Sequence, residues 1–224
     1  IKLSADPRKL THEEIERLWR QMQKTKFMKP PLNCLSPIGE EIMEAAMKKD
    51  LECEFVVATT RPPSVYRGFP FGIEVCIGYG GPKLKPNEPA QILRIANRVP
   101  LLYEASSCAI TKAIKKINWS AYRIEKQNNL PFGPIALMVH MYSTWIPYTS
   151  EGKEAIDAYP EILKEIRLAI QDCARKLARY LAGQRRARER ALRQSLFEKY
   201  IPETANALAQ ISDEKAEKIR EALE

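Results

Sequence analysis

A loop lysine is the residue in this chain whose position most clearly invites a chemical role. Lys153 lies in the polar segment PYTSEGKEAI, between an apolar stretch and a long helical one. A lysine ammonium on such a loop can bind a phosphate, but the neighbouring residues in the sequence provide no site for one. From these residues alone, Lys153 is expected to be a solvated side chain.

Other residue types with chemical potential form no recognisable site in the sequence. His12 and His140 have no Cys or Asp at ligand spacing, so structural or surface roles are expected. Gly78, Gly80 and Gly81 are not followed directly by a helix, which favours a turn at a strand end over a phosphate loop. The sequence shows no serine, cysteine or carboxylate constellation suited to catalysis. The chain is therefore not expected to be an enzyme on its own, and no metal site is expected.

Most of the positive charge lies on one segment near the C-terminus. The formal net charge is +8, and residues 175–193 contain eight Lys or Arg side chains and one acidic side chain. The arginines of its second half are Arg185, Arg186, Arg188, Arg190 and Arg193. Spread round a helix, they suit phosphate neutralisation without base recognition, although a solvated helix face explains them equally well. Residues 194–224 carry four basic and seven acidic side chains, so this tail is expected to have different neighbours.

The composition indicates a globular protein of one or two domains. The chain has 224 residues, of which 45% are hydrophobic and 29% charged. Its five cysteines are odd in number, widely spaced and without a C-x-x-C pair, as expected of reduced packing thiols in a cytoplasmic protein. No apolar run approaches the ~20 residues of a membrane span, and no signal peptide is recognised. The chain begins with Ile1 instead of Met, so a fragment is expected.

The elements that must position these residues change in type along the chain. After Thr11, the sequence T-H-E-E is followed by apolar residues at i, i+3, i+4 and i+7, the pattern of a capped amphipathic helix. A second helix is expected to begin at Ser36 and Pro37 and to run to about Lys49. Four strands are then expected in the segments EFVVATT, FGIEVCIGY (as a half-buried strand), ILRIANRV and PIALMVHMYSTW.

Helices follow the third and fourth strands. One is expected from about Ser106 to Ile117. Another begins at Pro160, carries an apolar stripe as far as Leu181, and continues as a stalk until Pro202 breaks it, with one or two short helices beyond. The order predicts an α+β fold, in which a four-stranded, mostly antiparallel sheet is backed by helices, with an N-terminal helical segment and a long C-terminal stalk helix.

Several runs of the sequence together resemble one protein family. These runs are TKFMKPPLNCLSPIGEE, TTRPPSVYRGFPFGIEV, ILRIANRVPLLYEASSCAITKAI, STWIPYTSEGKEAI and PEILKEIRLAI. They are similar, in order and over nearly the whole chain, to the B subunit of archaeal DNA topoisomerase VI, a type IIB enzyme. The resemblance implies that residues 1–50 end a helix–two-turns–helix domain. It further implies that residues 51–183 form a transducer domain with a ribosomal-protein-like fold and that 184–224 form the stalk helix and C-terminal helices.

The resemblance also implies a role for Lys153. In related ATPases, the loop between the last strand and the long helix sends a lysine to the γ-phosphate of ATP bound in the preceding domain. The nucleotide-binding motifs of that domain are absent here, so ATP and Mg would be bound outside this chain. Lys153 would then act as a γ-phosphate switch lysine, both catalytic and cofactor-binding. Thr149, Ser150 and Gly152 would give its loop freedom to move.

The implied function is to couple ATP binding and hydrolysis, and dimerisation with a second B subunit, to DNA strand passage through a break made by the A subunit. The alternative is a non-enzymatic nucleic-acid-binding module that uses the basic helix. One departure concerns the family pattern W-K-x-Y, where this chain has Ser120 between Trp119 and Tyr122. A role of that lysine cannot be transferred to Ser120. The aromatic pair is expected to pack beneath a loop.

Overall fold

The computed structural model describes residues 5–25, 34–211 and 215–223. Its centre is a six-stranded sheet in which β1, β3, β8, β4 and β5 follow one another and β2 pairs with β3. All pairings are antiparallel except that of β4 with β8. The strands are β1 (Phe55–Thr60), β2 (Ser64–Tyr66), β3 (Phe69–Tyr79), β4 (Gln91–Ala96), β5 (Val99–Pro100) and β8 (Ile135–Ser143). The α+β prediction with a mostly antiparallel sheet is confirmed, and β2 and β5 are additional strands.

Strand β3 is an inner strand that pairs with β1, β2 and β8, and it is buried on both faces. Ile73, Val75 and Ile77 belong to the larger core cluster, whereas Cys76 belongs to a smaller one on the other face. The prediction that this strand is half-buried was wrong. The cause is α2 (Glu40–Leu51), which packs on β1 and β3 through Met43 and Met47 and covers the second face.

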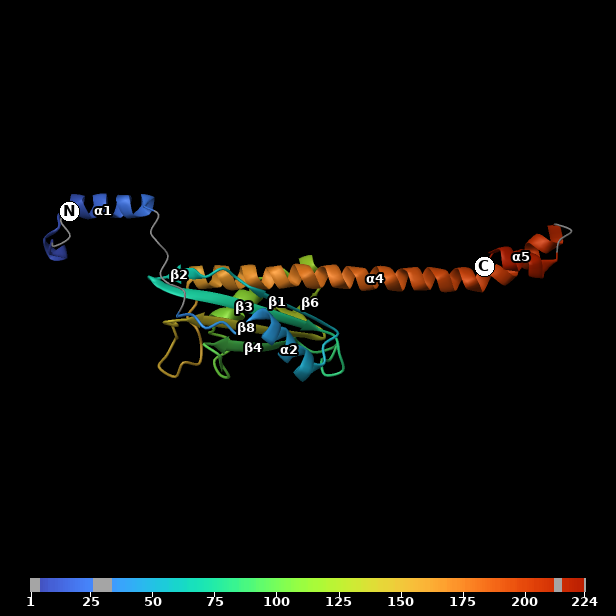
Figure 1. The fold of residues 1–224 in the computed structure, drawn as a ribbon, viewed down its shortest axis with the longest axis horizontal. Helices are drawn as coiled ribbons and strands as arrows, with labels where there is room; N and C mark the ends of the chain where they lie inside the picture. Colours follow the sequence, from blue (N-terminus) through green and yellow to red (C-terminus); the bar gives the residue numbers. More distant parts are fainter. Residues whose placement is uncertain (1–4, 26–33, 212–214, 224) are drawn as a thin grey trace.

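Helix α4 (Pro160–Ile211) covers the first face together with α3 (Ala109–Lys115). Ile162, Ile166, Ile170, Cys173 and Leu177 are fully buried, which confirms the apolar stripe. At ~1.5 Å per residue, the 52 residues of α4 extend about 78 Å. Its second half projects well beyond the sheet, as the long orange-to-red helix in Figure 1 shows.

The helix does not break at Pro202, contrary to the sequence-based prediction. α4 continues through Pro202 to Ile211, and α5 (Ala216–Leu223) follows and packs against it. Proline removes the amide hydrogen bond to the carbonyl one turn earlier, at Glu198. Glu198 is exposed, so water can hydrate that carbonyl and the helix persists.

Of the two N-terminal helices, the start of the first was predicted correctly and the start of the second was not. α1 (His12–Lys24) begins with the expected capping box, in which Thr11 and Glu14 each bond to the other's backbone amide. α2 does not begin at Ser36 and Pro37, because Gly39 has a φ of 98°, which a right-handed helix cannot include. The helix therefore starts at Glu40 and ends at Leu51.

Three further boundaries differ from the predicted ones. The expected third strand divides at Asn97 and Arg98, whose positive φ values of 44° and 67° form the turn between β4 and β5. Helix α3 is shorter than expected at both ends. A 3-10 helix (Trp119–Tyr122) and the hairpin of β6 (Glu125–Gln127) and β7 (Leu130–Phe132) follow it. A short 3-10 helix (Pro7–Lys9) precedes α1.

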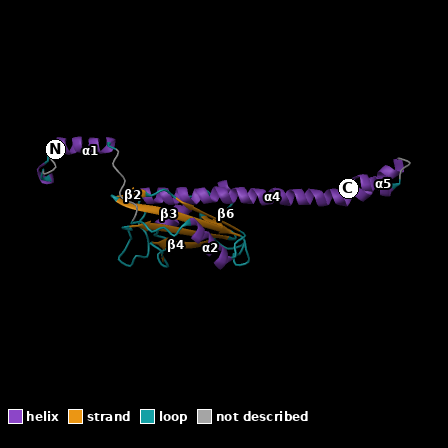
Figure 2. Ribbon diagram, in the orientation of Figure 1, coloured by secondary structure: helices purple, strands orange, loops and turns teal. Residues whose placement is uncertain are grey.

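Figure 2 shows the resulting division into one sheet-bearing body and a helical projection. In the described ranges, no helix is both long and apolar enough to cross a membrane.

Candidate functional site

The loop that carries Lys153 has a closed neck and a short tip. Between β8 and α4, Tyr148 pairs with Ile156 as an antiparallel bridge. The amide of Thr149 donates to the Ala155 carbonyl at 2.9 Å, and the amide of Asp157 donates to the Pro147 carbonyl at 2.7 Å. Only residues 150–154 remain beyond this neck. The tip is therefore the part of the loop that can move without breaking backbone hydrogen bonds of the neck.

Lys153 lies in a turn of this tip. Its φ is 55°, and its amide donates to the Ser150 carbonyl at 3.2 Å. The side chain is exposed, and its ammonium makes no hydrogen bond or ion pair with any residue that the structure describes. An unpaired ammonium on an exposed tip can accept an anionic ligand without first losing a partner.

The base of the loop is firmly held by the core. Ala155 and Ile156 are fully buried, and the amide of Ala109 at the start of α3 donates to the Ile156 carbonyl at 2.8 Å. In Figure 1, the loop, drawn in gold, hangs at the end of the sheet where α4 begins. The free part of α4 projects from the opposite end. A phosphate at Lys153 would therefore lie at the end of the sheet opposite to the stalk.

All five arginines of the basic helix lie on exposed positions of α4. Arg185, Arg186, Arg188, Arg190 and Arg193 project beyond the last buried turn, which ends near Leu181. Arg185 is paired with Glu189 at 3.3 Å, one turn later. It also borders a groove between α4 and the β6–β7 hairpin, which Tyr79, Arg123 and Phe132 help to line.

The basic helix and the Lys153 loop are thus separate features. The arginines present positive charge on several sides of one rod, an arrangement that can neutralise phosphates but cannot aim at one base.

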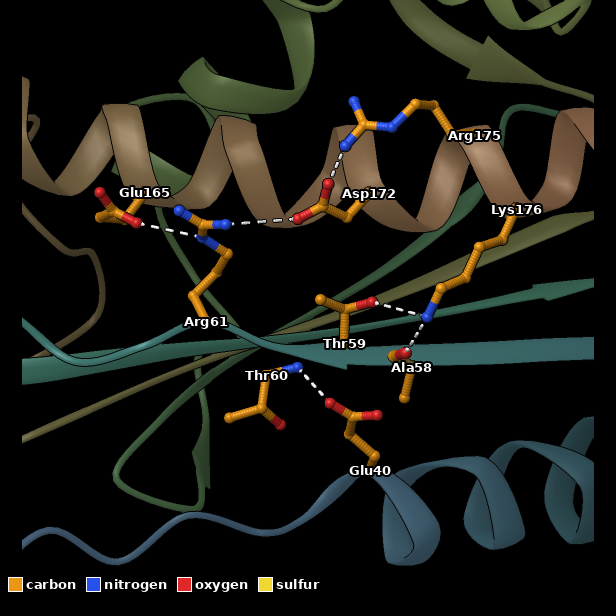
Figure 3. Close-up of polar contacts among 9 residues, drawn as sticks. All are labelled: Glu40, Ala58, Thr59, Thr60, Arg61, Glu165, Asp172, Arg175 and Lys176. Carbon is orange, nitrogen blue, oxygen red and sulfur yellow. Dashed lines mark hydrogen bonds and ion pairs between the residues drawn. The ribbon is translucent and has the colours of Figure 1, made fainter.

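The contact of α4 with strand β1 is fixed by an arginine that sequence reasoning did not single out. Arg61 directly follows β1, and its guanidinium binds Glu165 at 3.2 Å and Asp172 at 3.5 Å, two turns apart on α4 (Figure 3). Arg175 also pairs with Asp172. Arg61 and Glu165 are 104 positions apart. No local pattern connects them, so the sequence offered no basis for finding this contact.

A buried charge network joins the sheet to the start of α2. The Glu74 carboxylate lies on β3 and accepts from the amides of Ile38 and Gly39 at 2.8 and 2.9 Å. It also bonds to Nδ1 of His140 at 2.8 Å and accepts a long hydrogen bond from the Thr60 hydroxyl at 3.4 Å. Because the Arg98 amide donates to Nε2 of His140 at 3.1 Å, the proton of the neutral ring lies on Nδ1, which donates to Glu74. Burial raises the pKa of Glu74, but the hydrogen bonds from His140, Ile38 and Gly39 outweigh it and hold the pKa below its usual value.

This network gives His140 a structural role, as predicted. Trp119 is also fully buried, with its indole N–H donating to the Ile114 carbonyl at 3.1 Å, and Tyr122 packs against the same core. The expected packing of this aromatic pair is therefore confirmed, and Ser120 between them is exposed. Gly80 and Gly81 form the expected turn after β3, with φ values of 73° and 93°.

Cys53, Cys76, Cys108 and Cys173 are free thiols, as expected, and Cys76, Cys108 and Cys173 are buried packing residues. Cys34 differs from the expectation, because it is exposed. In the described part of the chain, no group of three or more His, Cys, Asp or Glu residues could hold a metal ion.

Comparison with known proteins identifies the family. Residues 30–193 match the family model described as the transducer of the topoisomerase VI B subunit. The chain belongs to this family. The match includes the sheet, the Lys153 loop, the buried part of α4 and the five arginines, so the body in Figure 1 is the transducer fold of a topoisomerase VI B subunit.

Curated relatives cover most of this transducer chain. The B subunit of type 2 DNA topoisomerase 6 from Pyrococcus furiosus is 45% identical over 216 residues, which make up 96% of this chain and 37% of the relative. Proteins of the same name from Thermococcus kodakarensis and Methanococcoides burtonii are 46% and 43% identical, over 96% and 91% of this chain. The chain spans 33% to 37% of the length of these relatives. Among solved structures, the B subunit of DNA gyrase from Myxococcus xanthus has a TM-score of 0.40 at 14% identity, over 61% of this chain and 38% of that one.

Proposed function

We propose that this chain is the transducer part of an ATP-dependent type IIB DNA topoisomerase. It would couple ATP binding and hydrolysis, and dimerisation with a second B subunit, to the passage of double-stranded DNA through a break made by the A subunit. Membership of the topoisomerase VI B family supports this proposal. The observation that carries the mechanism is the exposed, unpaired Lys153 on a tip whose base is buried at the start of α4.

The domain division proposed from the sequence accompanies this function. Residues 1–50 would end a helix–two-turns–helix domain, 51–183 would form the transducer, and 184–224 the stalk helix and C-terminal helices. ATP and Mg would be held by the part of the B subunit that precedes this chain. The proposed place of action is the cytoplasm.

Lys153 fits the terminal phosphate of such a nucleotide. The ATP would supply the phosphoryl group that is transferred to water, and the protein contribution from this chain would be a compact positive charge. Because the ammonium has no partner to give up, it can meet the phosphate when the domains close. After phosphate release the tip would return to solvent.

Movement of Lys153 would reach α4 through the neck of the loop. The Tyr148–Ile156 bridge and the Ala109–Ile156 hydrogen bond tie the tip to the core on which α4 packs. α4 is one uninterrupted helix of 52 residues, so a tilt at its first turns is enlarged at its far end. Rigid elements of this kind turn small shifts at a ligand site into large displacements elsewhere.

The other proposed contacts lie on the projecting part of α4. The five arginines from Arg185 to Arg193 would bind DNA phosphates. The topoisomerase function would therefore include the DNA contact of the basic helix that the nucleic-acid-binding alternative also predicts. Further along, Phe197 and Ile211 are 73% and 86% exposed. Exposed apolar residues on a helix of this length are typical of a protein interface, and we assign the tail from residue 201 to the A subunit.

The test is Lys153→Ala in a complete B subunit assembled with its A subunit. A charge at a developing phosphoryl charge is commonly worth about two to four kcal/mol in the transition state, so hydrolysis and supercoil relaxation should fall roughly 30- to 1,000-fold. Lys153→Arg should rescue poorly, because a planar guanidinium does not replace an ammonium.

The matched control is Lys164→Ala, which removes an exposed lysine from the first turns of α4. It should leave hydrolysis and relaxation unchanged. Full relaxation activity of Lys153→Ala, at equal A-subunit loading, would remove Lys153 from the mechanism.

A further inference from the structure

A group of exposed apolar side chains borders the Lys153 loop. We call this group the apolar rim, and its members are Phe69, Val99, Leu102, Tyr103 and Trp145. Leu102 and Tyr103 are 74% and 66% exposed. In residues 34–181, the other large apolar side chains that are exposed are Ile42 on α2 and Leu93 in the groove beside α2. Single exposed apolar residues are ordinary, whereas several at one place mark an interaction surface.

Hydrogen bonds join residues 97–104 to the Lys153 loop at both ends of this segment. At one end, the side chain of Asn97 donates to the Ser143 carbonyl and accepts from the Ser143 amide, each at 2.9 Å. At the other end, the Thr149 hydroxyl donates to the Glu104 carboxylate at 3.4 Å. The rim residues of this segment lie between these two points. In Figure 1, the segment follows β4 in green, beside the gold loop.

Phe69 and Trp145 extend the rim across the neighbouring strands. The amide of Trp145 donates to the Ser143 hydroxyl at 3.1 Å, just beyond β8. The ring of Trp145 lies on that of Phe69, at the start of β3, with centroids 5.4 Å apart. Because Ser143 also binds Asn97, the two parts of the rim meet at the end of β8.

A buried arginine fixes the part of the rim that follows β5. Arg94 on β4 is 4% exposed, and its guanidinium donates to the carbonyls of Leu101 and Tyr103 at 2.8 and 2.9 Å. Leu101 is itself buried in the core. Because the backbone is held on both sides of Leu102, its side chain stays directed outward. The rim is therefore a preformed surface, which loses less entropy on binding than a mobile loop would.

The chain also enters the sheet-bearing body beside the rim. The guanidinium of Arg98, next to Val99, donates to the Pro37 carbonyl at 2.7 Å. The amides of the two residues after Pro37 are held by Glu74. The part of the subunit proposed to precede this chain is thus connected beside the rim, and this chain spans 37% of the Pyrococcus furiosus relative. The stalk, with its proposed A-subunit contact, projects from the opposite end of the sheet.

We propose that the apolar rim is the surface on which the ATP-binding part of the same B subunit docks when it closes over Lys153. The inference rests on the proposed function, since that part and its ATP are themselves proposed. Docking of the rim buries several large apolar side chains, whereas Lys153 adds a single ionic contact. The rim therefore supplies much of the free energy of closure, and Lys153 makes closure depend on the terminal phosphate.

The first test is photo-crosslinking of the complete B subunit with its A subunit. Leu102 is replaced by benzoylphenylalanine, and the protein is irradiated with and without a non-hydrolysable ATP analogue. We expect a crosslink within one B subunit, to residues that precede this chain. The analogue should increase its yield about tenfold, the effect on an equilibrium of one hydrogen bond to a charged group.

The matched control places the same photo-crosslinking residue at Leu192. This side chain is 63% exposed but belongs to the projecting part of α4, so it should give no crosslink to the preceding part. The mass of the product shows which chains are joined. A crosslink from Leu102 to a second B subunit or to the A subunit, or no crosslink at all, would overturn the proposal.

The second test compares two substitutions of Leu102 in the complete enzyme. Leu102→Gln loses the gain from apolar burial on docking, so the kcat of ATP hydrolysis should fall about tenfold. Leu102→Met keeps an apolar side chain and should retain kcat. Neither change should lower the thermal transition of the 224-residue chain, where Leu102 is exposed. Unchanged kcat in Leu102→Gln, or a lower thermal transition of that variant in this chain, would overturn the docking role.

The two proposals fail in distinguishable ways. If Lys153→Ala retains full activity while Leu102 still crosslinks within the subunit, the docking surface stands and the role of Lys153 is lost. If Lys153→Ala loses activity but Leu102 crosslinks to another chain, the proposed function stands and only the docking surface is wrong.

Discussion

Arg61 should determine how firmly α4 is fixed along the sheet, and Arg61→Gln tests this. The change removes the guanidinium and leaves the Arg61 amide free to keep its hydrogen bond to the Ile73 carbonyl. Glu165, whose side chain is 14% exposed, then loses its cation. Asp172, which is 25% exposed, retains Arg175. The loss should therefore come mainly from the Arg61–Glu165 pair.

The magnitude follows from burial and distance. A hydrogen bond to a charged group contributes about 1.5–3 kcal/mol. The 3.2 Å contact with Glu165 is of ordinary length, whereas the 3.5 Å contact with Asp172 is weak. With Arg61 itself 28% exposed, solvent screens part of the interaction, so we expect a loss of about 2 kcal/mol. For a domain of this size the midpoint of thermal unfolding should fall by about 4–8 °C.

The assay is thermal unfolding of the 224-residue chain followed by circular dichroism. Arg175→Gln is the control, because Arg175 pairs with the same Asp172 but is 52% exposed, and its loss should cost less than about 1 kcal/mol. In a double-mutant cycle with Glu165→Gln, the coupling energy should be about 1–2 kcal/mol. A destabilisation by Arg61→Gln no larger than that of the control, or a cycle that closes additively, would refute the reasoning.

Two more outcomes are expected. If the arginines from Arg185 to Arg193 bind DNA phosphates, the logarithm of duplex affinity should fall with the logarithm of salt concentration at a slope of about −0.9 per contact. Replacing Arg186, Arg188 and Arg190 by Gln should make this slope shallower. An unchanged slope would indicate that these arginines are solvated and do not bind DNA. Because Glu74 has a lowered pKa in the folded state, its stabilising effect is complete above the unfolded pKa of about 4.3 and is lost as the pH falls through the lower folded pKa. Glu74→Gln should remove this part of the acid sensitivity when unfolding midpoints are measured over a pH series. Identical pH profiles of the variant and the original protein would contradict this role of Glu74.

Local sequence patterns predicted which helices and strands form, but they did not predict well what packs around each of them. The alternation from Phe71 to Tyr79 predicts a strand, because side chains on successive residues point to opposite faces. The alternation does not show that α2 covers the face of the strand that carries its polar residues. Helix α2 precedes the strand in the sequence and comes to lie on it only when the chain folds. Gly39 and Pro202 were misjudged for a related reason. The residue type sets a preference, and tertiary surroundings decide whether the chain follows it.

The candidate site was predictable only in part. The exposed loop of Lys153 follows from its polar residues, but its assignment to a phosphate came from the family resemblance and remains a proposal. Glu74 and His140 each interrupt an apolar strand with a polar residue, a pattern that could have suggested their pairing. The rings of Tyr66 and Tyr159 pack on each other, although 93 positions separate the two residues in the sequence. No pattern within either segment therefore predicts this contact.

Strand β1 is an outer strand of the sheet, yet three of its outward-facing backbone groups are already hydrogen-bonded. The amides of Ala58 and Thr60 donate to the carboxylates of Glu44 and Glu40 on α2, at 2.9 and 2.6 Å. From the other side, Lys176 on α4 donates to the Ala58 carbonyl (Figure 3). An open strand edge is a template on which another chain can add a strand, and this is a common start of aggregation. Here side chains of two helices occupy three hydrogen-bonding groups of that template, which disfavours the addition of a strand along β1.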